Sequence, residues 1–501
     1  MISNTIILPV LMHMLIAVLL IFFWRNVKAQ KIISVAGNLL VLGLGIEIFM
    51  LTWNNGIQTT QAGAWRAPFG ITFVADVFSS SMVLLTAIAG TAVGLFSTVG
   101  IRRERMKYGY FPIYHFLLMG LNGAFLTGDI FNLFVWFEII IIASFVLMTL
   151  GGRRLQIGAG IKYVTINLLA SVIFLTAIGI LYGLTGSLNM ADLSLKIAAI
   201  ENRGLVNVTA MLFFTSFGIK SAVFPLYFWL PASYHTPPSA ITAIFGGLLT
   251  KVGVYALIRT FTLIFVPDAF TTNVLLVVAT GTLLTGALGA LVKKDIRKLF
   301  SYLIVCHIGY MIAGLGMFTE IAIVGTLFYL FHDMMAKTNL FLITGLMTKI
   351  RGSGYYKDTG GLYKDYPRLS LIIAIVFFSV VGVPPLSGFW PKIYLFQAGL
   401  GTGSYILLGA MIIASFITLY VMAKCWSEMF WKPQPEENKK EPDNFSKMNR
   451  WDKTWMVGPI IMLAFISLYI GLGAEKIMMV SKHIAGELMD TGPYIKAVLG
   501  K

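Results

Sequence analysis

Charged side chains stand inside several long apolar stretches of this sequence, where an ion needs either a partner or a function. Four of them have no opposite charge three or four residues away: Glu138, Lys220, Lys251 and Lys392. A charge at the centre of a bilayer costs at least about 2.5–3.5 kcal/mol. Because burial disfavours the charged form of a lysine, a buried lysine can exchange a proton near neutral pH. The four residues therefore indicate a buried proton relay.

Two histidines and two further pairs of charges extend this set. His307 and His332 also lie in apolar stretches. Imidazole titrates at about pH 6.5, which suits a relay, although a hydrogen-bonded core histidine is the alternative. The remaining charges have an i,i+4 spacing that favours an ion pair on one helix: Asp333 with Lys337, and Lys424 with Glu428. For these pairs a local ion pair and a relay role both stay open.

Two of the lysines stand beside predicted breaks in helices. The stretch "GIKSAVFPLYFWLP" (218–231) places Pro225 five residues after Lys220, and "VVGVPPLSGFWPK" (380–392) places the adjacent prolines 384–385 and two glycines shortly before Lys392. Proline removes a backbone hydrogen bond, and within a membrane such a break requires protein or water to satisfy the freed groups. Paired broken helices are typical of inverted-repeat transporters.

Fourteen predicted membrane spans, of about 20 mostly apolar residues each, carry these features. The spans are residues 4–24, 32–53, 73–100, 111–127, 130–150, 160–185, 207–230, 239–261, 271–292, 298–317, 321–347, 369–390, 404–431 and 456–475. Lys220 and Lys392 lie five spans apart, and an odd offset inverts the topology. We expect an all-α integral membrane protein of about 14 helices, in which spans 4–8 and 9–13 form two inverted five-helix repeats containing broken helices.

The basic residues orient these spans. Alternate connecting loops, beginning with residues 25–31, contain 24 Lys and Arg residues, whereas the opposite side contains 8. Basic loops remain in the cytoplasm, so we expect a multi-pass protein of the cell membrane with both termini outside. The predicted segments are a three-helix N-terminal segment (1–110), the two repeats (111–261 and 271–431), and a cytoplasmic linker with the last span and a tail (432–501).

The composition excludes several functional classes. Of the 501 residues, 57% are hydrophobic and 12% are charged, against about 25% charged in a soluble domain. The net charge of +16 is explained by the cytoplasmic loops and does not indicate nucleic-acid binding. Cys306 and Cys425 lie far apart in apolar stretches and suggest neither a disulfide nor a metal site. Without a nucleotide-binding loop or a nucleophile constellation, we expect neither an enzyme nor a cofactor.

Four motifs resemble those of a known transporter family. They are "GDIFNLFVWFE" (128–138), "GIKSAVFPLYFWLPASYHTPPSAITAIFGGLLTKVGVYAL" (218–257), "KKDIRKLFSYLIVCHIGYM" (293–311) and "GVPPLSGFWPK" (382–392). They are similar to the antiporter-like family, which covers the Mrp-type sodium/proton antiporter subunits and the proton-pumping membrane subunits of complex I. The resemblance covers nearly the whole chain and implies fourteen helices with two inverted five-helix repeats.

The resemblance also implies a proton-translocating relay and its residues. These are a fifth-span glutamate at Glu138, lysines of spans 7 and 8 at Lys220 and Lys251, the histidine of a broken eleventh span at His332 with Lys337 behind it, and a twelfth-span lysine at Lys392. The sequence departs from common relatives at Cys306–His307, so a role for His307 does not follow from the resemblance. The implied partners are H⁺, Na⁺, the lipid bilayer and other antiporter subunits in a hetero-oligomeric membrane complex.

Two functions use the same relay. A subunit of a cation/proton antiporter is favoured by "FNLFVWFE" and by overall similarity. The alternative is a proton-pumping subunit of a complex I-like oxidoreductase or a membrane-bound hydrogenase. Because sodium prefers several oxygen ligands and the interior contains few carboxylates, we expect sodium to cross in a partner subunit or at an interface. A direct ion pair between Glu138 and Lys220 is also expected.

Overall fold

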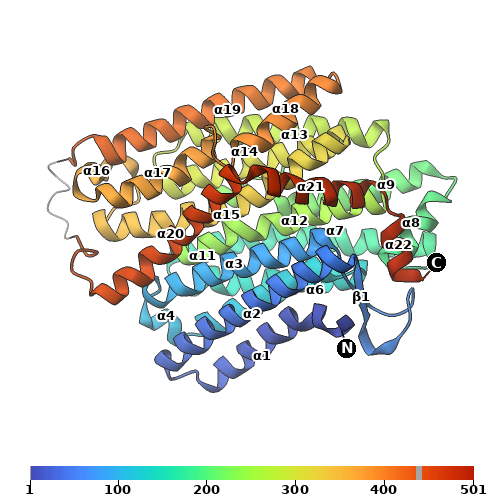
Figure 1. The fold of residues 1–501 in the computed structure, drawn as a ribbon, viewed down its shortest axis with the longest axis horizontal. Helices are drawn as coiled ribbons and strands as arrows, with labels where there is room; N and C mark the ends of the chain where they lie inside the picture. Colours follow the sequence, from blue (N-terminus) through green and yellow to red (C-terminus); the bar gives the residue numbers. More distant parts are fainter. Residues whose placement is uncertain (1, 436–442, 501) are drawn as a thin grey trace.

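The protein folds into a bundle of long helices that run roughly side by side (Figure 1). The computed structural model describes residues 2–435 and 443–500. The longer helices up to residue 263 are α1 (Leu8–Phe22), α2 (Val27–Asn55), α3 (Val77–Gly100), α5 (Tyr110–Leu126), α6 (Ile130–Thr149), α7 (Arg154–Thr185), α9 (Arg203–Ser221) and α12 (Thr250–Leu263). The later ones are α13 (Ala269–Val292), α14 (Ile296–Met317), α15 (Glu320–Arg351), α17 (Pro367–Val381), α18 (Phe389–Gly401), α19 (Tyr405–Trp426), α20 (Arg450–Leu472) and α21 (Ala474–Met489).

Shorter elements connect these helices. The short α-helices are α4 (Arg103–Lys107), α8 (Met190–Ala198), α10 (Trp229–Ser233), α11 (Ser239–Ile244), α16 (Leu362–Asp365) and α22 (Gly492–Leu499). Three 3₁₀ turns are η1 (Ile2–Ile7), η2 (Ala62–Ala64) and η4 (Tyr356–Asp358), and two π-helical turns are η3 (Phe245–Leu249) and η5 (Ser427–Trp431). One antiparallel hairpin, which the sequence pattern does not predict, pairs β1 (Gln58–Gln61) with β2 (Thr72–Ala75).

The membrane-spanning character of the chain is confirmed, although fewer helices than the fourteen expected are long and apolar enough to be identified as spans. Among the described residues, ten helices are long and apolar enough to cross a membrane. They match ten of the fourteen predicted spans. Of the other four, 207–230 and 369–390 fall on interrupted helices, 321–347 falls on the charge-bearing α15, and 111–127 is the 17-residue α5.

Two helices are interrupted, as the prolines predict, and the two gaps have the same backbone pattern. Residues 222–228 separate α9 from α10, and residues 382–388 separate α17 from α18. The first gap residue is left-handed in both, with φ of +62° at Ala222 and +86° at Gly382. The second gap residue donates its N–H to a carbonyl five residues earlier, at 3.0 and 3.1 Å. Both breaks therefore leave carbonyl groups without their usual helical partners.

The helix α15 occupies the centre of the bundle. It contacts α14, α18, α20 and α21, and Figure 1 shows it between the N-terminal helices and α18–α19. It is helical throughout its 32 residues. The expectation of a broken eleventh span is therefore wrong: the sequence between residues 320 and 351 contains no proline, and the helix keeps its charged side chains without an interruption.

The last predicted span, 456–475, falls on α20, which begins six residues earlier than expected and ends at Leu472. The tail predicted after it begins as a helix, because α21 starts after a single turn residue, Gly473. Gly471 allows α20 to touch the second break, since a Cβ atom there would lie 2.7 Å from the carbonyl oxygen of Pro385. Trp390 donates its indole N–H to the Gly471 carbonyl at 2.9 Å. The end of α20 thus closes over the α17–α18 gap.

The two ends of the bundle differ. Both termini lie at one end, whereas the α1–α2 turn, α4 and α16 lie at the other (Figure 1). The basic loops predicted to be cytoplasmic gather at this second end, which we call the basic end. Of the predicted cytoplasmic linker, residues 436–442 lie outside the described residues.

Candidate functional site

A buried carboxylate, Asp333 of α15, is the centre of the candidate site. It is fully buried, and two lysines and one histidine, from α12, α14 and α15 itself, approach it. The Lys251 Nζ atom of α12 lies 2.7 Å from Oδ2, and the His307 Nδ1 atom of α14 lies 2.7 Å from Oδ1. Lys337, one turn further along α15, lies 3.8 Å from Oδ1. The spacing in the sequence predicts only the pair with Lys337, and the structure makes Asp333 an interhelical junction instead.

The π-helical turn η3 positions Lys251. A π turn leaves a backbone carbonyl unpaired, and such turns are frequent at functional sites. Here the carbonyl of Gly246 accepts a hydrogen bond from Lys251 Nζ at 2.7 Å. Gly247 brings the turn against α15, because a Cβ atom there would lie 1.9 Å from the Thr338 hydroxyl oxygen. The Lys251 ammonium is thereby held between the turn and Asp333.

Aromatic rings connect the two buried histidines. The Tyr329 ring centroid lies 5.3 Å from that of His307 and 5.9 Å from that of His332. His332 Nδ1 lies 2.7 Å from Ser387 Oγ, which belongs to the second break. Among the described residues, Nε2 of either histidine has no hydrogen-bond partner. The sequence pattern indicates the two histidines but not Tyr329, whose spacing of three residues from His332 is the only indication in the sequence that it joins them.

Lys392 lies at the second break, as predicted. Its Nζ atom donates to the carbonyl of Val381, the last residue of α17, at 2.7 Å. It also lies 5.5 Å from the centroid of the Tyr310 ring. A cavity of about 420 Å³ extends from Lys392 to the side of the bundle, where Phe416 is exposed. The broken helix thus supplies an acceptor that an intact helix would not.

Glu138 and Lys220 face each other without forming the direct ion pair that we expected. Lys220 Nζ donates to Ser171 Oγ at 3.4 Å and lies 4.8 Å from the Phe137 ring centroid. The carboxylate of Glu138 acts on this ammonium electrostatically. No ion pair within 4.0 Å joins the two side chains, and Glu138 Oε1 has no hydrogen-bond partner in the described part of the chain.

A small cavity lies beside Lys220, among residues of α6, α7, α9 and α12. Lys220 lines it together with Asn167 of α7 and Val252 of α12, which directly follows Lys251. Its volume of about 20 Å³ accommodates one water molecule, given the polar groups on its walls. The structure therefore arranges the predicted residues in three neighbouring groups: Glu138 with Lys220, then Lys251 with Asp333, His307 and Lys337, then His332 with Lys392.

The predicted pair of Lys424 with Glu428 is not formed. Glu428 instead pairs with Lys432 at 2.7 Å, and the Lys432 side chain is 58% exposed. Lys424 lies 5.8 Å from the centroid of the Tyr420 ring. Glu428 has a lysine four residues away on either side, and the pair with Lys432 places the acid first, which is the favoured order on a helix.

A second buried ion pair, far from the relay residues, was missed in the sequence. Arg259, one of the eight basic residues assigned to the outer side in the sequence, near the end of the predicted span 239–261, is buried within α12 and lies 2.6 Å from Asp76. Its guanidinium also donates to the Tyr255 hydroxyl at 3.3 Å. Asp76 caps the N-terminus of α3 and accepts the N–H of Ser79 at 2.8 Å. This pair joins α3 to α12 at the end that carries the termini.

Comparison with known proteins places this arrangement in a family. The family described as "NADH:quinone oxidoreductase/Mrp antiporter, TM" matches residues 127–418. This range covers more than half of the chain and contains the relay residues that the resemblance implies: Glu138, Lys220, Lys251, His332, Lys337 and Lys392. The chain belongs to this family. The NADH:quinone oxidoreductase/Mrp antiporter family is the one that the four sequence motifs indicate.

Individual relatives narrow the resemblance within the family. The chain is 42% identical to the D subunit of the Na(+)/H(+) antiporter of Alkalihalophilus pseudofirmus, over 99% of both chains. It is 39% identical to the D subunit of the Na(+)/H(+) antiporter of Bacillus subtilis, again over 99% of both. The structure matches a chain of the Mrp complex from Dietzia sp. DQ12-45-1b, covering 100% of both chains with a TM-score of 0.91 and 28% identity. The resemblance to Mrp-type antiporters is thereby confirmed. The two sequence relatives named here are both D subunits.

A further structural match shows the fold alone. A chain of an archaeal membrane-bound sulfane sulfur reductase superposes with a TM-score of 0.89 at 24% identity, over 99% of this chain. The same bundle therefore occurs in an antiporter complex and in a respiratory complex. For the present chain, the named relatives indicate a membrane transporter subunit of a multi-subunit complex and not a catalytic enzyme.

Proposed function

We propose that this chain is the proton-translocating subunit of a multi-subunit sodium/proton antiporter. The observation that carries the proposal is the buried row of ionisable groups centred on Asp333, where lysines of α12 and α15 and a histidine of α14 meet one carboxylate. Such groups in a membrane interior are rare and mark ion or proton pathways. The antiport itself is inferred from the function that the names of the relatives state.

The proposed route follows the three groups in order. A proton reaches Lys220 beside Glu138, and a water in the 20 Å³ cavity passes it toward Lys251. The pair of Lys251 with Asp333 shares it with Lys337 and His307, and His332 and Lys392 complete the route at the second break. Each charged lysine repels the next, strongly so at low dielectric, so a proton entering at one end biases release at the other.

The proposal includes the finer architecture predicted from the sequence. We take α5, α9–α10, α15 and α17–α18 as the four additional crossings, because each packs among the ten apolar helices. The matching breaks then lie in two inverted five-helix repeats, residues 111–261 and 271–431, between the segments 1–110 and 432–501. The basic end faces the cytoplasm, and both termini lie outside.

Sodium is proposed to cross outside this relay. The partners would be the other subunits of an Mrp complex, A, B, C, E, F and G. A path lined by lysines repels a cation that has no proton to exchange, and coupling would be electrostatic, through the charge at Lys220. A redox-driven pump could use the same relay, but 42% identity over 99% of an antiporter subunit favours antiport.

The first prediction tests this division of labour. In liposomes, the isolated chain is expected to take up no more sodium in response to an imposed pH gradient than protein-free liposomes do, whereas the assembled complex exchanges sodium for protons. Sodium flux and internal pH are measured together, and circular dichroism verifies the helical fold of the isolated chain. Robust sodium/proton exchange by the chain alone would contradict the proposal.

The second prediction separates the relay from charges at the periphery. Replacing Glu428 with glutamine in the assembled complex is expected to lower antiport less than about twofold, because a solvent-exposed i,i+4 ion pair contributes only about 0.3–0.5 kcal/mol. Antiport is measured in everted membrane vesicles as sodium-dependent loss of a pH gradient. The matched variant Glu138→Gln makes the same change in the relay and is expected to abolish antiport. Equal losses in the two variants would contradict the assignment.

A further inference from the structure

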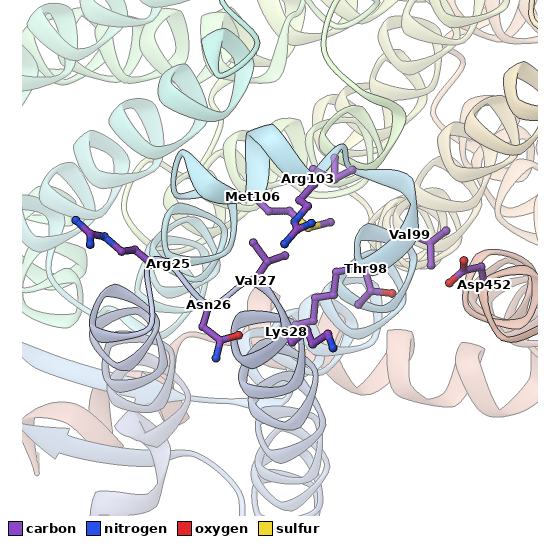
Figure 2. Close-up of a pocket in the computed structure, with 11 residues that line it drawn as sticks. Arg25, Asn26, Val27, Lys28, Thr98, Val99, Arg103, Met106 and Asp452 are labelled. Carbon is purple, nitrogen blue, oxygen red and sulfur yellow. The ribbon is translucent and has the colours of Figure 1, made fainter. Parts of the chain in front are cut away.

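A basic cavity lies at the basic end, between the α1–α2 turn, the end of α3 and the beginning of α20. Its volume is about 620 Å³. The cations that line it are Arg25, Lys28, Lys31 and Arg103, and the only acid is Asp452. Figure 2 shows Arg103 reaching into the space above Val27, whereas Arg25 points outward and Asp452 stands at the opposite rim. The cavity thus has a surplus of positive charge.

These cations lack protein partners. Among the described residues, no carboxylate lies within 4.0 Å of the four basic side chains, and none of them donates a hydrogen bond. Arg25, Lys28 and Arg103 are exposed, and Lys31 is half-buried. Asp452 is near enough to Lys31 to attract it, but it neutralises at most one of the four charges. The cavity therefore favours an anion supplied from outside the chain.

An apolar groove continues directly from this cavity. The groove, of about 440 Å³, shares Lys31 and Asp452 with the cavity and then follows α2. Its walls on α2 are spaced at three and four residues, so they form one face of the helix: Ile32, Val35, Ala36 and Leu39. Seven residues of helix extend about 10 Å. Trp455 closes the other side, at a position typical of an aromatic belt at the membrane surface.

The groove surface is apolar and open. Ile32 is 70% exposed and Leu39 is 52% exposed, although both belong to a predicted membrane span. A charged mouth joined to an apolar groove matches the two parts of a phospholipid. Basic pockets between helices on the cytoplasmic side bind anionic headgroups. A free phosphate would use only the mouth, and a partner helix would leave the cations unneutralised.

We propose that this cavity and groove bind an anionic phospholipid of the cytoplasmic leaflet. Lys28, Lys31 and Arg103 hold the headgroup phosphate, and one acyl chain lies along Ile32 and Leu39. The lipid would bridge α2, α3 and α20. Because α20 also packs against α15, which carries Asp333, the lipid seats the last span against the central helix.

The third prediction tests the lipid site on the purified complex. Binding of fluorescent phosphatidylglycerol is expected to weaken about a hundredfold in the variant Lys28→Gln/Lys31→Gln/Arg103→Gln, since each interfacial cation contributes roughly fivefold. The variant Ala36→Trp keeps every charge but fills the groove, and it is expected to bind the lipid at least about tenfold more weakly. Phosphatidylcholine is expected to bind weakly to all forms.

A matched control removes the same charge elsewhere on the basic end. The variant Lys357→Gln/Lys364→Gln/Arg368→Gln changes three exposed cations that line neither the cavity nor the groove, and it is expected to bind phosphatidylglycerol as the wild type does. Unchanged lipid affinity in the Lys28/Lys31/Arg103 variant overturns the proposal. So does full competition by inorganic phosphate combined with normal binding to Ala36→Trp, which indicates a free-anion site.

A protein occupant is tested separately. The variant Ala36→Cys, in the assembled complex, is treated with a bifunctional thiol–amine crosslinker. No crosslink to another subunit is expected. A crosslink would show that a partner helix fills the groove, and it would overturn the lipid proposal. If the triple variant does not assemble, Lys28→Gln and Ala36→Trp decide the question, because each changes one surface residue.

Discussion

Antiport by the assembled complex is expected to fall by at least about a hundredfold when Asp333 is replaced with asparagine, because removing one partner of a buried ion pair costs about 3–5 kcal/mol. The carboxylate oxygens of Asp333 lie 2.7 Å from Lys251 Nζ and 2.7 Å from His307 Nδ1, and Lys337 Nζ lies 3.8 Å away. Without it, Lys251 and Lys337 face each other in a fully buried site with no carboxylate to neutralise them. The measurement is sodium-dependent loss of a pH gradient in everted vesicles.

Three further variants distinguish a lost relay from a lost fold. Asp333→Glu retains the charge and is expected to retain part of the activity. Asp333→Asn/Lys251→Met removes both members of the Lys251–Asp333 ion pair. The complex should therefore assemble with normal yield and still lack antiport. Asp365→Asn removes an acid that pairs with Arg351 but is 47% exposed, and antiport should persist. Normal antiport in the assembled Asp333→Asn complex would show that this carboxylate is not in the route.

The sequence predicts which side chains are unusual better than it predicts which of them meet. Lys251 has no acid at i±3 or i±4, so a partner on another helix follows directly. Asp333 has Lys337 at i+4, and this local pairing conceals its role. In the structure the interhelical contact with Lys251 is shorter than the local one. Contacts within one helix can be predicted from the spacing of residues in the sequence, whereas contacts between helices depend on how the helices pack.

Backbone breaks are also predictable, because they depend on residues of the same helix. Proline acts on its own helix, so the interruptions at residues 222–228 and 382–388 follow from the sequence. Tertiary effects are not local. Arg259 looks like a loop cation until α3 brings Asp76 within 2.6 Å of it. Glu428 has lysines at both i−4 and i+4, and it pairs with Lys432, so spacing identifies possible partners but not the one that is used.

Replacing Lys220 with methionine is expected to abolish antiport while leaving assembly intact. Lys220 makes one long hydrogen bond, 3.4 Å to Ser171, and one contact with the Phe137 ring at 4.8 Å. At 3.4 Å the hydrogen bond is longer than the usual range of about 2.7–3.2 Å and therefore weak, so we expect the fold to tolerate its loss. The relay does not, because Lys220 is the cation beside Glu138 and lines the water-sized cavity next to α12, the helix that carries Lys251. Lys162→Met on the exposed surface of α7 is the matched control, with antiport expected at the wild-type level.

The variant Lys220→Arg decides how this residue acts. Arginine keeps a positive charge near Glu138, but its guanidinium does not release a proton in proteins. If Lys220 carries the proton, Lys220→Arg is expected to be as inactive as Lys220→Met. If Lys220 only supplies a fixed charge, arginine should restore most of the activity. Sodium-dependent proton movement in vesicles, with assembly monitored by co-purification of the other subunits, separates the two, and wild-type antiport in Lys220→Arg would remove Lys220 from the list of proton carriers.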